Sequence, residues 1–202
     1  MLIEQLPYFL RGIYLGATWR KDCHEKVIYL TFDDGPIPEV TPWVLDILDH
    51  YQIKATFFCV GENVMRHPDL YQEIIRRGHR TGNHTYNHMR GFFTDTPLYL
   101  ENTKKAEDYI ESDLFRPPHG EMRLSQFRAL RKKHQVILWD VITRDYNQKL
   151  PKEKVLNIAK RYARNGSIIV FHDSLKAEKN MRYAMPRAID FLQEEGYQFR
   201  TL

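Results

Sequence analysis

Two adjacent carboxylates, Asp33 and Asp34, stand in the stretch TFDDGP at residues 31–36, directly after an apolar run. Neighbouring carboxylates repel each other, and the cost of that repulsion rises where water is excluded. A metal cation is the first candidate to offset this charge. One carboxylate can then bind the ion while the other moves protons, and the Gly-Pro turn that follows leads the chain away from the site.

Two histidines, His84 and His88, are spaced four residues apart in the stretch HTYNH. On a helical turn this spacing places both imidazoles on one face, with their Cβ atoms about 6 Å apart. Zinc-type ions accept imidazole and carboxylate ligands together, at about 2.0–2.2 Å. Two histidines and one aspartate leave coordination positions open for water, as catalytic rather than structural sites do. The sequence therefore predicts a catalytic metal centre made by the two histidines and one residue of the aspartate pair.

Further acidic, imidazole and guanidinium groups follow later strand-like runs. His172 in IIVFHD can act as a general acid, and Asp145 or Asp173 can orient it and hold it protonated, with Asp140 as another candidate. Arg116, before PPHG, can pair with the free carboxylate and fix its position. A structural hydrogen bond for His172 and an ordinary salt bridge for Arg116 are the alternatives to these roles.

Strand-like runs must bring these residues together. Seven such runs alternate with helical patterns, at residues 26–32, 55–60, 79–84, 113–117, 135–140, 167–172 and 197–202. Alternation at this spacing favours an α/β fold with a parallel sheet and covering helices. Seven strands can form an open doubly wound sheet or a barrel-like ring, and the pattern alone does not separate the two. In both, active sites assemble at the carboxyl ends of the strands, where these polar residues would converge.

Composition limits the class of protein further. The chain of 202 residues suits one domain with a substantial core, and 43% hydrophobic residues exclude a disordered chain. The net charge of +4 is small and scattered, so we expect no nucleic-acid partner. Two cysteines, Cys23 and Cys59, predict no disulfide framework. No apolar run approaches about 20 residues, so we expect no integral membrane span.

Five motifs, TFDDGP, HTYNH, RPPHG, WDVITRDY and VFH, occur in this order and resemble those of the polysaccharide deacetylase (NodB-homology) family of carbohydrate esterases. The resemblance runs from about residue 26 to the C-terminus. It implies a distorted (β/α) barrel with about seven parallel strands. It also implies a metal-dependent hydrolase that removes N-acetyl groups from N-acetylglucosamine-type sugars in chitin-like or peptidoglycan glycans. A hydrolase of another amide or ester, and a non-catalytic carbohydrate-binding protein, are the alternatives.

The resemblance also implies a role for each matching residue. Asp33 would be the general base, and Arg116 would orient it. His172 would be the general acid, tuned by Asp145. One divalent metal ion is implied, with Zn²⁺ first and Co²⁺, Ni²⁺ or Mn²⁺ as alternatives. Its implied ligands are Asp34, His84 and His88.

The same resemblance implies a substrate-lining set and shows where this chain departs from the family. The backbone N–H of His119 would help to hold the oxyanion, although the family commonly has an aromatic residue at this position. Tyr146 replaces a common tryptophan, Ile142 occupies a position that is often acidic, and Val170 stands where many members have leucine. Trp139 completes the implied set. These departures affect the identity of the substrate more than the activity.

Residues 1–25 lie outside the resemblance. We expect them to form an N-terminal segment packed on or preceding the domain, with residues 26–202 as the catalytic domain. Glu4 and Arg11 make the start of the chain a poor signal peptide, which leaves a cytoplasmic or an envelope-associated protein. Peripheral membrane contact by residues 1–20 is the alternative to packing. The expected partner is an N-acetylated glycan, and the sequence does not indicate an oligomeric state.

Overall fold

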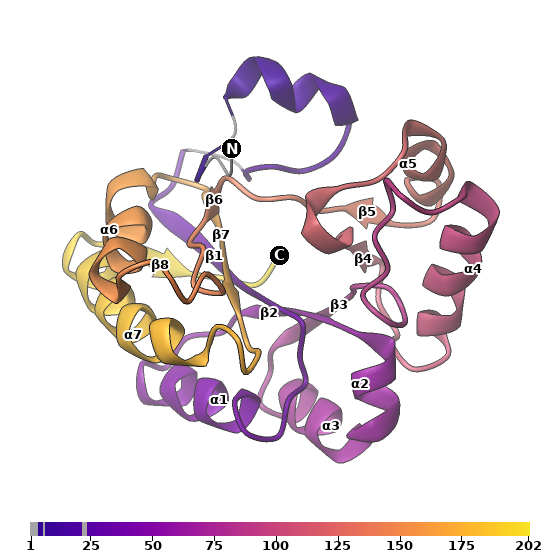
Figure 1. The fold of residues 1–202 in the computed structure, drawn as a ribbon. Coiled ribbons are helices and arrows are strands. Elements are labelled where there is room, and N and C mark those ends of the chain that lie inside the picture. The colour runs from indigo at the N-terminus through magenta and orange to yellow at the C-terminus, as the bar shows by residue number, and fades with distance from the viewer. Residues whose placement is uncertain (1–3, 6, 22–23) are drawn as a thin grey trace.

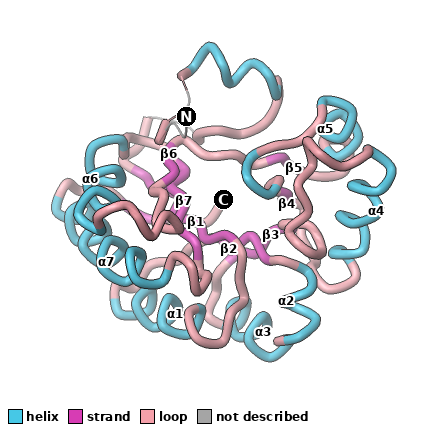
Figure 2. The backbone as a smooth tube through the Cα atoms, viewed as in Figure 1, coloured by secondary structure: helices cyan, strands magenta, loops and turns pink. Residues whose placement is uncertain are grey.

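A curved sheet of parallel strands lies inside a ring of helices (Figure 1). The tube view separates the two layers, with the strands at the centre and the helices outside (Figure 2). The computed structural model describes residues 4–5, 7–21 and 24–202. The strands are β1 (Val27–Asp33), β2 (Thr56–Cys59), β3 (Arg80–Asn83), β4 (Leu114–Phe115), β5 (Gln135–Val136), β6 (Val141–Ile142), β7 (Ile168–His172) and β8 (Gln198–Phe199). The α-helices are α1 (Thr41–His50), α2 (Gly61–Arg66), α3 (Pro68–Arg76), α4 (Thr96–Glu107), α5 (Leu124–Leu130), α6 (Lys152–Tyr162) and α7 (Glu178–Glu194), and the 3-10 helices are η1 (Tyr8–Tyr14) and η2 (Pro118–Gly120).

The order of the strands makes the sheet an open half-barrel. They pair in the order β5-β4-β3-β2-β1-β7-β6, and β8 pairs separately with the start of β1. Because β5 and β6 form the two edges, the sheet curls without closing into a ring. The expected α/β fold, a distorted barrel with about seven parallel strands, is confirmed.

The prediction of one strand over residues 135–140 is wrong. Only Gln135–Val136 of this stretch form a strand, β5, and β6 begins after it at Val141, at the opposite edge of the sheet. Residues 137–140 carry the chain across the open side between these edges. Ile137 and Leu138 are buried there, and their carbonyl groups accept hydrogen bonds from the side chain of Arg116. The apolar residues of this stretch therefore predict a buried strand, although residues 137–140 form a connection between β5 and β6.

The N-terminal residues pack against this crossing segment. Thr18 forms a parallel bridge with Ile137, and Arg20 forms an antiparallel bridge with Ser167. The carbonyl group of Glu4 accepts a hydrogen bond from the N–H of Ile142 in β6. Residues 1–3, 6 and 22–23 of the expected segment lie outside the described residues. The division of the chain at residue 25 stays a prediction.

The centre of the fold is apolar and its outer surface is charged. Phe32 of β1 stacks on Phe57 of β2 at 4.9 Å and on Phe171 of β7 at 6.4 Å between ring centroids. These rings hold the three central strands in register, which places Asp33 opposite His172 at the carboxyl ends of β1 and β7. Cys59 is buried and free, whereas Cys23 lies outside the described residues.

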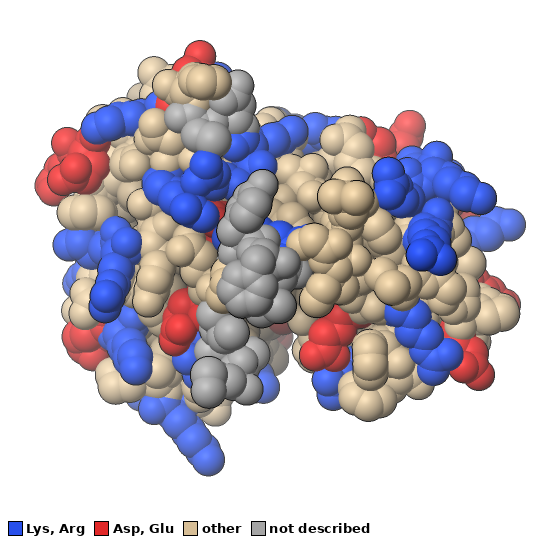
Figure 3. Space-filling model, turned by 90° about the horizontal axis from the view of Figure 1, so that it is seen from above, with Lys and Arg blue, Asp and Glu red and all other residues tan. Residues whose placement is uncertain are grey.

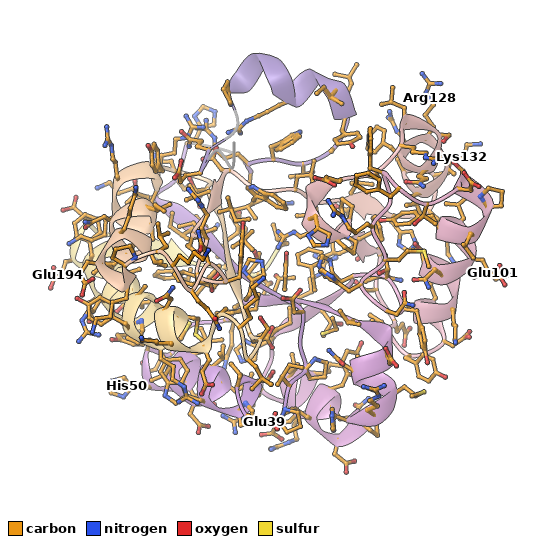
Figure 4. The ribbon with its side chains drawn as sticks, viewed as in Figure 1. Glu39, His50, Glu101, Arg128, Lys132 and Glu194 are labelled. Carbon is orange, nitrogen blue, oxygen red and sulfur yellow. The ribbon has the colours of Figure 1, made fainter. Side chains whose placement is uncertain are left out.

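Charged side chains on the helices point away from the sheet, as the labelled Glu101, Arg128 and Glu194 show (Figure 4). On the face that Figure 3 shows, Lys and Arg side chains lie over both sides of the molecule, with acidic residues between and beside them. In the part of the chain that the structure describes, no helix is long and apolar enough to cross a membrane.

Candidate active site

A buried ion pair between Asp33 and Arg116 lies at the carboxyl end of β1. Nη1 of Arg116 donates to Oδ1 of Asp33 at 2.6 Å and to the hydroxyl of Thr31 at 2.9 Å. The guanidinium also packs over the ring of Phe58, 4.0 Å from its centroid. Arg116 has no exposed surface and Asp33 is 3% exposed. The arginine is therefore fixed from several sides and holds the carboxylate of Asp33 in one orientation.

Asp34, His84 and His88 lie together next to this ion pair. Oδ1 of Asp34 is 3.2 Å from Nε2 of His88 and 3.9 Å from Nε2 of His84. The three side chains each offer one ligand atom, and these atoms all lie within 4.8 Å of one another. The backbone of Asp34 has a positive φ of 89°, and its carbonyl group accepts a hydrogen bond from the side chain of Asn63 at 2.8 Å. This local turn directs Asp33 and Asp34 to different partners.

The two histidines meet without the helical turn expected for residues 84–88. The segment is a loop, with positive φ values of 64° at Thr85 and 57° at His88. The side chain of Asn83 accepts a hydrogen bond from the N–H of Thr85, and the hydroxyl of Thr85 accepts one from the N–H of Met89. These side-chain bonds replace helical backbone bonds and bring the imidazole centroids within 5.1 Å.

The protonation of His84 suits a metal ligand. Its Nδ1 donates a hydrogen bond of 2.8 Å to the carbonyl group of Arg116, so Nε2 carries the free electron pair that faces Asp34. Burial lowers the pKa of His84 to about 4, against the smaller opposing effect of the neighbouring carboxylates. A neutral imidazole whose other nitrogen donates to a carbonyl group is the usual arrangement of a metal-binding histidine.

Asp34 supplies the test of whether a cation fits this set. Oδ1 of Asp34 is buried and, among the described residues, has no hydrogen-bond partner despite its short distance to His88. Burial by itself raises the pKa of Asp34, but the neighbouring histidines outweigh it and hold the pKa well below its usual range. An ionised carboxylate with an unused buried oxygen beside two imidazole nitrogens fits a zinc-type ion.

His172 and Asp145 form a second pair on the other side of Asp33. Oδ1 of Asp145 accepts a hydrogen bond from Nδ1 of His172 at 2.7 Å, and Oδ2 accepts one from the backbone N–H of His172 at 2.8 Å. Burial lowers the pKa of His172, but the charge and hydrogen bond of Asp145, with help from Asp34 and Asp33, raise it to about 9. The imidazole therefore carries a proton at neutral pH.

The other two aspartates considered for His172 have different partners. Asp140 accepts hydrogen bonds from Arg11, Arg164 and Ser167, near the N-terminal segment. Asp173 follows His172 directly, and consecutive residues of an extended chain point to opposite sides.

Asp173 braces the loop after β1. Its Oδ1 accepts a hydrogen bond from the N–H of Gly35 at 3.1 Å, and its Oδ2 accepts one from the hydroxyl of Thr41 at 2.6 Å. A Cβ atom on Gly35 would lie 2.0 Å from Oδ2, so only glycine allows this approach. Burial is the main cause that raises the pKa of Asp173 to about 8. This bracing role could not be predicted from the sequence, because the partners are more than a hundred residues apart.

The implied substrate-lining residues surround these two pairs. His119 has a positive φ of 60°, and its ring lies edge-on to that of His88, with the centroids 4.7 Å apart. Within the described part of the chain, the backbone N–H of His119 has no acceptor. Trp139 packs so closely on the neighbouring turn that a Cβ on Gly120 would lie 2.4 Å from its ring. Tyr146 lies edge-on to His172, with the ring centroids 4.9 Å apart.

Val170 lies two residues before His172 on β7, so both side chains face the same side of the sheet. It is fully buried and pairs with Thr31 of β1 and with Ile142 of β6. The structure thus brings every implied residue to the carboxyl edge of the sheet or directly beneath it.

Fold and site together define an α/β enzyme in which a candidate metal centre, a carboxylate and a protonated imidazole meet at one edge of a parallel half-barrel. The chain belongs to the polysaccharide deacetylase family, whose sequence model matches residues 20–137.

Three similar proteins place the chain within this family. A peptidoglycan-N-acetylglucosamine deacetylase of Bacillus cereus is 34% identical over 193 residues, which are 92% of this chain and 91% of that protein. The crystal structure of a peptidoglycan N-acetylglucosamine deacetylase in complex with an N-hydroxybenzamide has a TM-score of 0.89 and 28% identity, and the match covers 98% of this chain and 95% of that one. A family four carbohydrate esterase pseudoenzyme from Bacillus anthracis has a TM-score of 0.79 and 25% identity, with 91% and 66% covered. Because the last is a pseudoenzyme, the fold alone does not establish activity. Whether a member of this fold is active depends on the residues of its site.

Proposed function

We propose that this protein removes the N-acetyl group from N-acetylglucosamine residues of a glycan by metal-dependent hydrolysis. The observation that carries the proposal is the buried Oδ1 of Asp34, which has no hydrogen-bond partner among the described residues and faces two imidazoles, with a fixed carboxylate and a protonated imidazole beside it. The names of the similar B. cereus protein and of the solved deacetylase structure support N-acetylglucosamine in peptidoglycan as the substrate.

Asp34, His84 and His88 would hold one divalent cation, and Zn²⁺ fits this donor set best. When bound, such an ion activates water and polarises a carbonyl oxygen. Co²⁺, Ni²⁺ and Mn²⁺ accept the same nitrogen and oxygen donors and stay alternatives.

Asp33 is the proton acceptor in this proposal. Its Oδ1 is engaged by Arg116, while its Oδ2 faces the metal-binding set, 4.0 Å from Nε2 of His84. The carboxylate is therefore oriented with one oxygen available to take a proton from the attacking water. Arg116 acts through Asp33 and does not itself meet the substrate, because it is fully buried.

His172 is the proton donor. An amine is a poor leaving group unless its nitrogen is protonated as the carbon–nitrogen bond breaks. Asp145 keeps a proton on the imidazole at neutral pH, and 12% of the His172 side chain is exposed, so the proton can be delivered. The backbone N–H of His119 would donate a hydrogen bond to the acetamide oxygen as it gains charge.

The proposal is tested by acetate release from chito-oligosaccharides and from purified peptidoglycan. We expect release by the wild-type protein and a loss on the order of 10²-fold or more in Asp33→Asn, which cannot accept the proton. Asp46→Asn is the matched control, since this carboxylate lies on α1 with 67% of its side chain exposed, and it should behave as wild type. No acetate from either glycan, with turnover of another amide or ester instead, would contradict the assignment of the substrate.

A further inference from the structure

Two exposed phenylalanines follow the candidate metal site along the chain. Phe92 and Phe93 are 59% and 69% exposed, and their rings contact each other edge-on at 5.6 Å between centroids. The guanidinium of Arg90 lies over the ring of Phe93 at 4.7 Å. Single exposed apolar residues are common, but two adjacent aromatic rings in contact on one turn are an unusual use of surface.

The turn that carries these rings is held from below by a buried glutamine. The side-chain amide of Gln126 has no exposed surface, and it donates to the carbonyl groups of Gly91 and Thr94, each at 2.9 Å. Arg123 donates to the carbonyl group of Phe92 at 3.2 Å. A Cβ on Gly91 would lie 2.8 Å from Oε1 of Gln126, so the backbone of the turn packs on Gln126 at a distance that only glycine allows. A fully buried amide fixes the turn, which indicates that the position of the two rings matters.

The turn borders the same edge of the fold as the site. Phe92 follows His88 by four residues, so the backbone between them spans at most about 14 Å. Arg90 forms an ion pair with Glu121 at 3.1 Å, and Glu121 stands two residues after His119, whose ring meets that of His88. The residues on both sides of the turn are thus tied to the candidate metal site.

We propose that Phe92 and Phe93 form a stacking subsite for a sugar ring of the glycan strand, beyond the sugar whose acetamide reacts. The inference rests on the proposed function and adds how the polymer is held. The C–H face of a pyranose ring is apolar and packs on an aromatic face, whereas its hydroxyl groups stay in water at an exposed site. A ring that is already fixed by its turn loses little conformational freedom when the sugar binds.

The test compares substrates of different length. We expect wild-type kcat/KM for acetate release to be higher on the chito-oligosaccharide hexamer than on the dimer. In the Phe92→Ala/Phe93→Ala protein, kcat/KM on the hexamer should fall about three- to tenfold, while that on the dimer is unchanged. Phe92→Tyr/Phe93→Tyr keeps both rings and should retain the wild-type preference. Ile75→Ala removes an exposed apolar residue (42%) from the far end of α3 and should change neither value.

Direct binding separates this inference from the proposed function. If the wild type releases acetate but the alanine variant keeps the same length preference, the subsite is refuted and the function stands. If neither chito-oligosaccharides nor peptidoglycan yield acetate, the function fails, and calorimetric binding of the hexamer decides the subsite: weaker binding by the alanine variant supports it, and equal or absent binding refutes it. If the wild type sediments with phosphatidylglycerol vesicles and the alanine variant does not, while the variant keeps the wild-type length preference, the rings bind a lipid surface and the proposal is overturned.

Discussion

Replacing Asp145 by asparagine should lower the pKa of His172 more than any other single change in the site. The carboxylate accepts hydrogen bonds from both the ring Nδ1 and the backbone N–H of His172. An asparagine at position 145 offers one oxygen and one NH₂ group to two donors, so it loses the charge and also one of the two contacts. The burial that lowers the pKa remains in the variant, and it is the largest single cause acting on this imidazole.

The magnitude follows from the wild-type value. Raising the pKa of His172 from 6.5 to about 9 corresponds to about 3 kcal/mol, at 1.36 kcal/mol for each pKa unit. Because the pKa is higher in the folded than in the unfolded protein, this stabilisation is fully present below pH about 6.5 and is lost as the pH rises through about 9. In Asp145→Asn the pKa should fall to 6.5 or below, and that pH dependence should disappear.

The assay is an NMR titration of the His172 ring protons in chelator-treated protein, with urea unfolding at both ends of this pH range. Asp46→Asn is the control for a carboxylate remote from the site. The alkaline limb of the pH–rate profile should also move to lower pH in the Asp145→Asn enzyme, although such limbs belong to coupled groups. A folded Asp145→Asn protein in which the pKa of His172 stays near 9 would refute the role of Asp145. The raised pKa would then be due to the other carboxylates, Asp34 and Asp33.

Three further predictions concern the remaining groups. Arg116→Met leaves the charge of Asp33 buried and unpaired, so we expect the free energy of unfolding to fall by about 3–5 kcal/mol, and by clearly less in an Asp33→Asn background, as measured in urea; equal losses in both backgrounds would contradict the pairing. Asp33→Asn should keep its bound metal by elemental analysis while turnover is lost, and metal loss in this variant would mean that Asp33 is a ligand. His84→Ala and His88→Ala should each lose the metal, and undiminished metal in both would defeat the ligand assignment.

Much of the architecture could be predicted because the signals are local. Alternating apolar runs predict strands, and in a parallel sheet their carboxyl ends must meet, which is why Asp33 and His172 could be expected to converge. Residues 135–140 show the limit of this reasoning. Burial makes the stretch apolar whether it pairs in a sheet or crosses the open side, and only the positions of β5 and β6 at opposite edges separate these cases.

The site shows a similar limit. The spacing of His84 and His88 predicted their proximity only on the assumption of a regular helical turn. In the structure, a loop with positive φ at Thr85 brings the two imidazole rings together instead. The choice among three aspartates as partner of His172 depended on side-chain direction and distant contacts. Asp173 could not be assigned from sequence because its partners, Gly35 and Thr41, are brought to it only by the pairing of β1 with β7.

The central claim is that Asp34, His84 and His88 hold one metal ion on which deacetylation depends. Titration of chelator-stripped protein with Zn²⁺, followed by acetate release from the chito-oligosaccharide hexamer, tests it most directly. We predict no release without added metal, a linear rise in rate that ends at one equivalent, and no such rise for His88→Ala. Full acetate release by metal-free protein, or an unchanged titration curve in His88→Ala, would contradict the account.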